Sequence, residues 1–270
     1  MSQAKSLFDQ GQLGPAIEEL TREVKGNPSN IGFRTFLFEL LCFAGDWNRA
    51  ERQLDVIGHQ NAQAKLGVDV YRNNIKAERD RRRLFDDGVA PHFLNEPPAY
   101  IDPLLSAIEQ LHTGNDEEAQ KLIDRVEAER PRLSGKVNDC AFEDFRDCDD
   151  LTGPVLELIV HDKYTWLPFE QINRVEIAKP RNLRDLLWAS AHIEAADGTV
   201  AEAFLPALYA GSSDYPDDDV KLGRRTEWNE ENLAAGSRLF LVDDEEKQIF
   251  EASTIEFNHT GTSARTSART

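Results

Sequence analysis

The sequence predicts an α+β protein in which tetratricopeptide-like helical repeats are followed by a small antiparallel β-barrel or sandwich domain. Within residues 1–133, one arrangement of glycine, alanine and proline or asparagine recurs among apolar residues of helical spacing. After Pro154 the apolar residues alternate along short runs instead, which is typical of half-buried strands. The 270 residues suffice for one large domain or two ordinary ones.

The first two repeats are 34 residues apart along their whole length. The pairs with this spacing are Leu7 and Leu41, Gly11 and Gly45, Ala16 and Ala50, and Leu20 and Leu54. This period is typical of tetratricopeptide helix–turn–helix units. The glycine is expected to end the first helix in a left-handed conformation, and the alanine lets the two helices pack closely. Ordinary helical hairpins with a coincidental spacing are the alternative.

A third unit begins near Ile101 and carries its glycine at Gly114, with Ala119 and Pro131 at the matching offsets. Between the second and third units, residues 63–85 are predicted to form one long polar helix without a central glycine. A proline-rich loop, GVAPHFLNEPPAY, follows this helix. The repeats are therefore not expected to form a uniform solenoid.

Residues 134–150 separate the helical region from the strands. This segment is acidic and rich in turn-forming residues, so it is predicted to be a connector with little regular structure. Residues 151–257 contain short strand-like runs joined by close turns, including a tight turn at Asp197-Gly198. The tail, residues 258–270, repeats TSART and lacks large apolar side chains, which predicts disorder.

The composition restricts the classes of partner. The formal net charge of −18 argues against general nucleic-acid binding, because phosphate backbones attract basic surfaces. No apolar run approaches the roughly 20 residues of a membrane-spanning helix, and the first residues lack the apolar core of a signal peptide. Cys42, Cys140 and Cys148 form no CxxC pair, so reduced cysteines in the cytoplasm are expected.

The sequence lacks the motifs that would indicate catalysis, since it contains no GxSxG, GxxxxGK[ST], GxGxxG or HExxH. Clustered carboxylates can hold Mg²⁺ or Ca²⁺. Two such clusters are present: Glu143, Asp144, Asp147, Asp149 and Asp150, and Asp217, Asp218 and Asp219. Solvated charge is the simpler interpretation, and we predict no enzyme, no cofactor and no metal. A metal-dependent hydrolase that uses the acidic connector is the alternative.

Several short motifs follow one another in the second half of the chain. They are Asp147-Cys-Asp-Asp150, Leu156-Glu157, Tyr164-Thr-Trp166-Leu-Pro168-Phe, Pro180…Asp185-Leu-Leu-Trp188, Leu205-Pro206-Ala-Leu-Tyr209 and Leu222-Gly-Arg224…Trp228. In this order, after tetratricopeptide-like helices, they resemble the ImpE family, also called TagJ. Together with the helical repeats, the resemblance covers about residues 1–257.

The resemblance implies a cytoplasmic, non-catalytic accessory protein of a type VI secretion system. It implies binding to the amino-terminal, amphipathic helix of the small subunit of the contractile sheath. It also implies a link to recruitment of the ATPase that disassembles the sheath, and it supplies no catalytic residues. A repeat-based adaptor unrelated to secretion is the remaining alternative.

Stacked helical hairpins offer a groove that suits an amphipathic helix. In tetratricopeptide geometry the first helix of each pair lines this groove. The predicted partner contacts are Thr35, Glu39 and Phe43 in the second unit and Leu104 and Ile108 in the third. Alternatively, Phe43, Leu104 and Ile108 belong to the core. If the groove interpretation holds, residues 1–133 should bind the helix without the rest of the chain.

Overall fold

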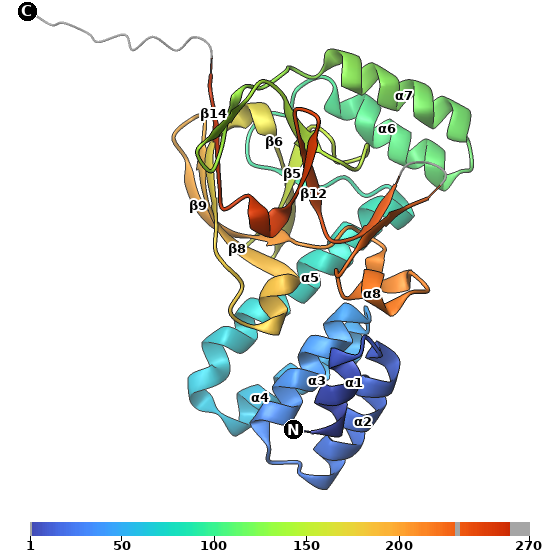
Figure 1. Cartoon of the computed structure of the whole chain (residues 1–270), viewed down its shortest axis with the longest axis vertical. Coiled ribbons are helices and arrows are strands. Elements are labelled where there is room, and N and C mark those ends of the chain that lie inside the picture. The colour runs from blue at the N-terminus through green and yellow to red at the C-terminus, as the bar shows by residue number, and fades with distance from the viewer. Residues whose placement is uncertain (1, 230–232, 260–270) are drawn as a thin grey trace, which may run out of the picture.

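The computed structural model describes residues 2–229 and 233–259 (Figure 1). It consists of a mainly helical half, up to residue 133, and a strand-rich half after it. The α-helices are α1 Gln3–Asp9, α2 Leu13–Gly26, α3 Ile31–Phe43, α4 Trp47–Gln60, α5 Lys65–Asp87, α6 Ile101–His112, α7 Asp116–Glu129 and α8 Asp218–Lys221. None of the described helices combines the length and the apolar character needed to cross a membrane.

Left-handed glycines join the two helices of each repeat, as the sequence predicts. Gly11, Gly45 and Gly114 have φ angles of 78°, 67° and 75°. Both helices of the second repeat begin with a polar side-chain cap. The side chains of Asn30 and Asp46 accept hydrogen bonds from backbone N–H groups in the first turns of α3 and α4. The predicted hairpin turns are confirmed at all three glycines.

The third pair of helices lies apart from the first two. α5 runs from the end of α4 beneath the strand-rich half and ends at Gly88, whose φ angle is 69°. Figure 1 shows α6 and α7 at the opposite end of the molecule from α1–α4. The long helix predicted over residues 63–85 is confirmed, with bounds shifted by two residues. The three repeats therefore do not stack into one continuous groove.

Most of the described strands belong to one sheet. The strands are β1 His92–Phe93, β2 Gly135–Val137, β3 Cys140–Phe142, β4 Phe145–Asp147, β5 Val155–Val160, β6 Lys163–Pro168, β7 Ile172–Ile177, β8 Trp188–Ala195, β9 Val200–Pro206, β10 Thr226–Trp228, β11 Ala234–Gly236, β12 Leu239–Val242, β13 Glu245–Gln248 and β14 Thr254–Phe257. The large sheet has the order β1-β6-β5-β9-β8-β7-β14-β2-β3, a second has the order β13-β12-β4, and β10 pairs with β11. The pairs between these strands are antiparallel except for β1 with β6.

Two expectations about the strands need correction. In the described part of the chain the large sheet ends at β1 and β3, so it does not close, and the predicted barrel is not confirmed. Residues 134–150, expected to have little regular structure, contribute β2, β3 and β4. Each is three residues long, and both β2 and β4 pair with strands about 100 residues away, β14 and β12. Such pairing leaves almost no local pattern in the sequence.

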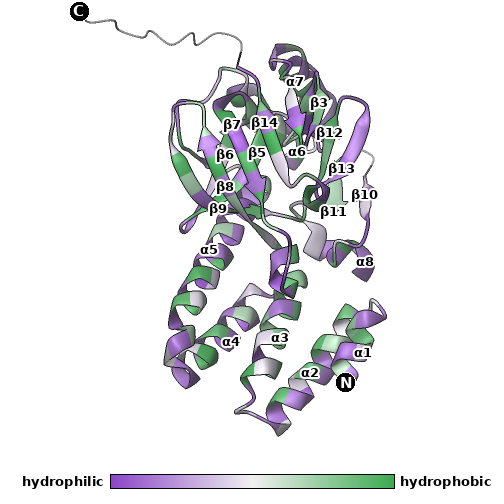
Figure 2. Cartoon of the chain, turned by 60° about the vertical axis from the view of Figure 1, so that its left-hand side comes forward, coloured by the Kyte–Doolittle hydropathy of each residue, from purple (hydrophilic) through white to green (hydrophobic). Residues whose placement is uncertain are grey.

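The interior strand β5 shows how the sheet is covered on both faces. Val155 and Ile159 belong to a hydrophobic core shared with the helices, whereas Leu156 and Leu158 belong to a second core shared with the small sheet. Successive side chains of a strand point to opposite faces, so Glu157 faces the helices. Figure 2 shows α2, α4 and α5 alternating between hydrophobic and hydrophilic residues, as helices with one buried side do. Because the first core spans both halves, the division into domains 1–133 and 151–257 stays a prediction.

Residues 218–224 of the strand-rich half rest against the first repeat. The carboxylate of Asp218 accepts a hydrogen bond of 2.8 Å from the backbone N–H of Leu13, at the start of α2. A carboxylate is favourable there because the first N–H groups of a helix are unpaired and carry partial positive charge. Arg224 donates to the carbonyl oxygen of Phe8 at 2.8 Å. These contacts give one member of the second acidic cluster a structural role.

The predicted disordered tail falls mostly on residues 260–270, which lie outside the described part of the chain. The two tail residues that are described are attached to the sheet. The backbone N–H of Asn258 donates to the carbonyl oxygen of Ser134 at 2.8 Å, and Nε2 of His259 lies 2.8 Å from the carbonyl oxygen of Ile172.

Candidate functional site

An apolar groove opens between α1, α3 and a turn that precedes β8; we call it the α1–α3 groove. Its volume is about 740 Å³. Its hydrophobic lining consists of the half-buried Phe8, Phe33, Phe36, Leu183 and Leu186. The rings of Phe8 and Phe36 meet edge to face, with their centroids 5.7 Å apart. Ser2, at the beginning of the described chain, also borders the groove.

The turn before β8 forms one wall of the groove. The carboxylate of Asp185 accepts hydrogen bonds of 2.8 Å from the backbone N–H groups of Arg181 and Asn182. This capping box begins a 3₁₀ turn that extends from Leu183 to Leu186. Residues three apart in a 3₁₀ helix share one face, so both leucines can line the groove.

Arg184 attaches this turn to the helices. Its guanidinium lies 3.0 Å from the carboxylate of Glu39 on α3 and donates a hydrogen bond to the hydroxyl of Tyr71 on α5. Burial raises the pKa of Glu39, although Arg184 opposes this shift. Glu39, predicted as a partner contact, therefore lies behind the wall of the groove and positions it.

The other predicted contact residues are not brought together. Leu104 and Ile108 are buried in α6, at the far end of the molecule from α3. Phe43 is 1% exposed and borders a different cavity, whereas Thr35 is half-buried on α3. The burial favours the core interpretation for Phe43, Leu104 and Ile108. The five residues as a set of partner contacts stay a prediction.

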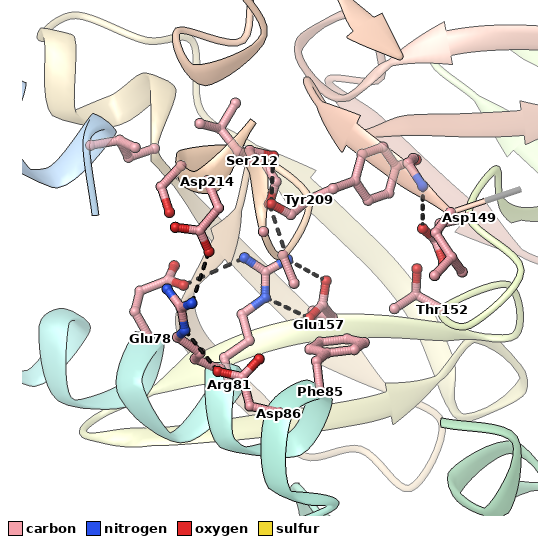
Figure 3. Close-up of a pocket in the computed structure, with 18 of the residues that line it drawn as sticks. Glu78, Arg81, Phe85, Asp86, Asp149, Thr152, Glu157, Tyr209, Ser212 and Asp214 are labelled. Carbon is pink, nitrogen blue, oxygen red and sulfur yellow. Dashed lines mark hydrogen bonds and ion pairs between the residues drawn. The ribbon is translucent and has the colours of Figure 1, made fainter. Parts of the chain in front are cut away.

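A second cavity, the interface cavity, has a volume of about 220 Å³ and lies between α3, α5 and the strand-rich half (Figure 3). Arg81 projects from α5 to Glu157 of β5, and two guanidinium nitrogens lie 2.7 and 2.8 Å from the two carboxylate oxygens. Arg81 also donates to the carbonyl oxygen of Leu208 at 3.0 Å. This two-point contact joins the helical half to the sheet beside the cavity.

Glu157 is shared with a second buried arginine. Arg238 contacts both Glu157 and Asp147, and the hydroxyl of Tyr209 donates to Asp147 at 2.8 Å. The side chains of Arg81, Glu157 and Arg238 are 5%, 1% and 1% exposed, and that of Asp147 is fully buried. Two arginines and two carboxylates thus compensate one another where water is excluded.

Asp149 lies in the wall of the interface cavity. Its carboxylate accepts hydrogen bonds from the backbone N–H groups of Leu151 and Ala234 at 2.9 and 2.7 Å. Burial raises the pKa of Asp149 to about 7, and the charge of Asp147 adds to this rise while the hydrogen bond from Ala234 opposes it. The carboxyl group is therefore held mainly in its neutral form below neutral pH.

This raised pKa predicts a pH dependence of stability. The unfolded chain loses the Asp149 proton near pH 3.9, whereas the folded chain keeps it to about pH 7. The folded form binds more protons between these values, so the free energy of unfolding should fall, relative to an Asp149→Asn variant, as the pH rises from about 4 to about 7. Urea unfolding of both proteins at several pH values in this range measures the difference. A constant difference would mean that Asp149 is ionised in the folded protein throughout.

The carboxylates of the hydrolase alternative are engaged by other groups. Asp144 accepts from both terminal nitrogens of Arg130 at 2.7 and 2.8 Å, and Asp150 pairs with Arg146 at 3.0 Å. Among residues 2–229 and 233–259, no group of three or more His, Cys, Asp or Glu side chains could hold a metal ion.

Sequence reasoning missed both walls of the α1–α3 groove. The residues of these walls, Phe33, Phe36, Leu183 and Leu186, were not among the predicted partner contacts. One signal was present: Asn182 precedes an acidic residue by three positions, which is the spacing of a capping box. It predicts a helical turn but not the surface against which the turn packs.

Comparisons with known proteins agree along nearly the whole chain. The model of the family described as ImpE protein matches residues 139–256. The chain is 37% identical over 257 residues to the type VI secretion system accessory component TagJ of Pseudomonas aeruginosa, which spans 95% of this chain and 92% of that protein. It is 27% identical to protein VPA1032 from Vibrio parahaemolyticus, whose crystal structure matches with a TM-score of 0.88 over 96% of this chain and 98% of that chain. The chain therefore belongs to the ImpE/TagJ family of type VI secretion system accessory components.

Proposed function

We propose that this protein is a cytoplasmic, non-catalytic adaptor that binds the N-terminal amphipathic helix of the small contractile-sheath subunit in the α1–α3 groove. Binding there would modulate sheath assembly or recruitment of the sheath-disassembling ATPase. The observation that carries the proposal is the open apolar groove beside the first two repeats. Membership of a family named for a secretion accessory role supports the identity of the partner.

The lining of the groove suits an apolar stripe on a helix. An amphipathic helix offers side chains at i, i+3, i+4 and i+7 along one face. The lining contains three phenylalanines and two leucines that are only half-buried in the free protein. Such a stripe would cover more of their apolar surface and remove it from contact with water. Apolar burial of this kind contributes roughly 25 cal/mol per Å² before the costs of association are subtracted.

The groove needs both halves of the chain. Leu183 and Leu186 belong to the strand-rich half, so a fragment of residues 1–133 lacks one wall. The same fragment would expose the side of α5 that carries Arg81, which is buried against Glu157 in the whole protein. The experiment below therefore uses the full chain rather than the helical half, although the sequence suggested that the helical half would suffice.

Replacing Phe33 with alanine is expected to weaken binding of a labelled sheath-helix peptide by about 2 kcal/mol, or roughly thirtyfold in Kd. The loss follows from removing an aromatic anchor at the centre of a contact. Fluorescence anisotropy with the full-length protein measures Kd, and circular dichroism checks that the variant is folded. Phe250→Ala is the matched control, because Phe250 is also half-buried but packs against the second core.

Two results would count against the proposal in different ways. If the wild-type protein does not bind the sheath helix, the proposed partner is wrong. If the folded Phe33→Ala and Phe250→Ala variants lose affinity equally, the partner is still supported, but the α1–α3 groove is not its binding site.

A further inference from the structure

The charge that lines the α1–α3 groove is opposite in sign to the charge of the whole chain. The chain has 49 acidic and 31 basic residues. Among the described residues that line the groove, two carry a charge, Lys5 and Arg181, and both are basic. Lys5 lies on α1, with its ammonium 5.5 Å from the centre of the Phe8 ring, and Arg181 lies on the turn before β8.

Carboxylates next to these residues in the sequence are already engaged. Asp9 pairs with Lys5 one turn along α1. Asp185 turns its carboxylate to the backbone N–H groups of Arg181 and Asn182. The guanidinium of Arg181 itself is exposed and makes no ion pair with the rest of the described chain. A positive charge is therefore available at the edge of an apolar surface.

We propose that the α1–α3 groove selects an amphipathic helix that carries carboxylates beside its apolar stripe. This inference rests on the proposed function and adds the chemistry of the occupant to it. A helix whose stripe covers the phenylalanines and leucines brings its flanking positions to the exposed guanidinium of Arg181, whereas Lys5 is already paired with Asp9. Ion pairs at the rim of an interface add little affinity, but they decide between partners whose apolar stripes are alike.

Because the whole protein is negatively charged, the sign of the charge on the preferred peptide tests this selection. A protein with a formal charge of −18 attracts cationic peptides over long distances, whatever their shape. General electrostatics therefore favour a helix with basic flanks, whereas recognition at the groove favours one with acidic flanks. A preference for the acidic helix would oppose this long-range attraction and would therefore indicate a local basic site, which the Arg181 variant tests.

The probes are two labelled peptides of about 18 residues, roughly five helical turns, with one apolar stripe in common. One has glutamate and the other lysine at the positions that flank the stripe. The full-length protein should bind the glutamate peptide more tightly, by up to about fivefold, through the contact with Arg181. Arg181→Glu should reduce or reverse this preference. Arg132→Glu, the same change at an exposed arginine after α7, should leave the preference as it is in the wild type.

The results separate this inference from the proposed function. Equal or tighter binding of the lysine peptide by the wild type would overturn the charge selection, and so would an equal effect of Arg181→Glu and Arg132→Glu. Either result is compatible with binding of the sheath helix itself, which is measured with its own peptide. If the sheath helix does not bind the wild-type protein, the proposed function is wrong. A preference for the glutamate peptide would in that case still support the groove as a binding site.

Discussion

Replacing Glu157 with glutamine is expected to lower the free energy of unfolding by about 3–5 kcal/mol. Glutamine has nearly the same shape, so the change removes charge and little else. Arg81 and Arg238 both depend on this carboxylate, and Tyr164 donates its hydroxyl to it. Without it, Arg238 keeps Asp147 as its carboxylate partner, and Arg81 keeps Glu78, at 3.4 Å, and the carbonyl oxygen of Leu208, at 3.0 Å. Each buried cation then has one carboxylate fewer, which is costly because the charge has left water and is compensated less well.

Urea unfolding followed by circular dichroism measures this effect. The matched control is Glu202→Gln on β9, where the glutamate pairs with His192 but has an 81% exposed side chain. The control should change stability by less than about 0.5 kcal/mol, because exposed pairs contribute little. A loss below about 1 kcal/mol for Glu157→Gln would indicate that water reaches the arginines and that the network is not needed to join α5 to the sheet.

The second large effect is expected at the glycine of the second repeat. Gly45→Val should cost about 1–2 kcal/mol for the left-handed backbone, and about 1–3 kcal/mol more for overpacking. A Cβ atom on Gly45 would lie 2.7 Å from the hydroxyl oxygen of Ser213, which belongs to the strand-rich half. The turn between α3 and α4 is thus pressed against that half and has no room for a side chain.

Gly114→Val separates the two contributions. Gly114 has a φ angle of 75° against 67° for Gly45, but nothing lies within 4 Å of a Cβ built there. The Gly114 variant should therefore lose only the backbone contribution. Equal losses in the two variants would show that Ser213 moves aside at no cost. Negligible losses in both would show that neither turn needs the left-handed conformation.

The repeats could be predicted from sequence because their signals are local. A left-handed glycine after a helix and a small residue on the returning helix lie within a few positions of each other, and the structure has both at Gly45 and Ala50. β2 and β4 could not be predicted in this way. β2 pairs locally with β3, but its other neighbour, β14, and the partner of β4, β12, lie about 100 residues later, and no period within residues 134–150 records that long-range pairing.

The groove residues were hard to predict for a related reason. Tetratricopeptide geometry assigns the inner side of the first helix to the partner, but here α5 and the strand-rich half cover part of that side. Phe43 is consequently buried, and Glu39 is bound to Arg184 of the turn before β8. What remains open is the part of α3 that carries Phe33 and Phe36. A repeat pattern alone does not reveal which part of a helix face a later segment of the chain will occupy.

The position of Ser2 at the edge of the α1–α3 groove has a practical consequence for labelling. An affinity tag or fluorescent protein joined to the amino terminus would be tethered within a few residues of the surface proposed for the partner, where it would compete for space. The described chain leaves β14 at the other end of the molecule (Figure 1). Imaging and pull-down reagents should therefore carry their fusion at the carboxyl terminus, so that loss of partner capture reports on the protein and not on the tag.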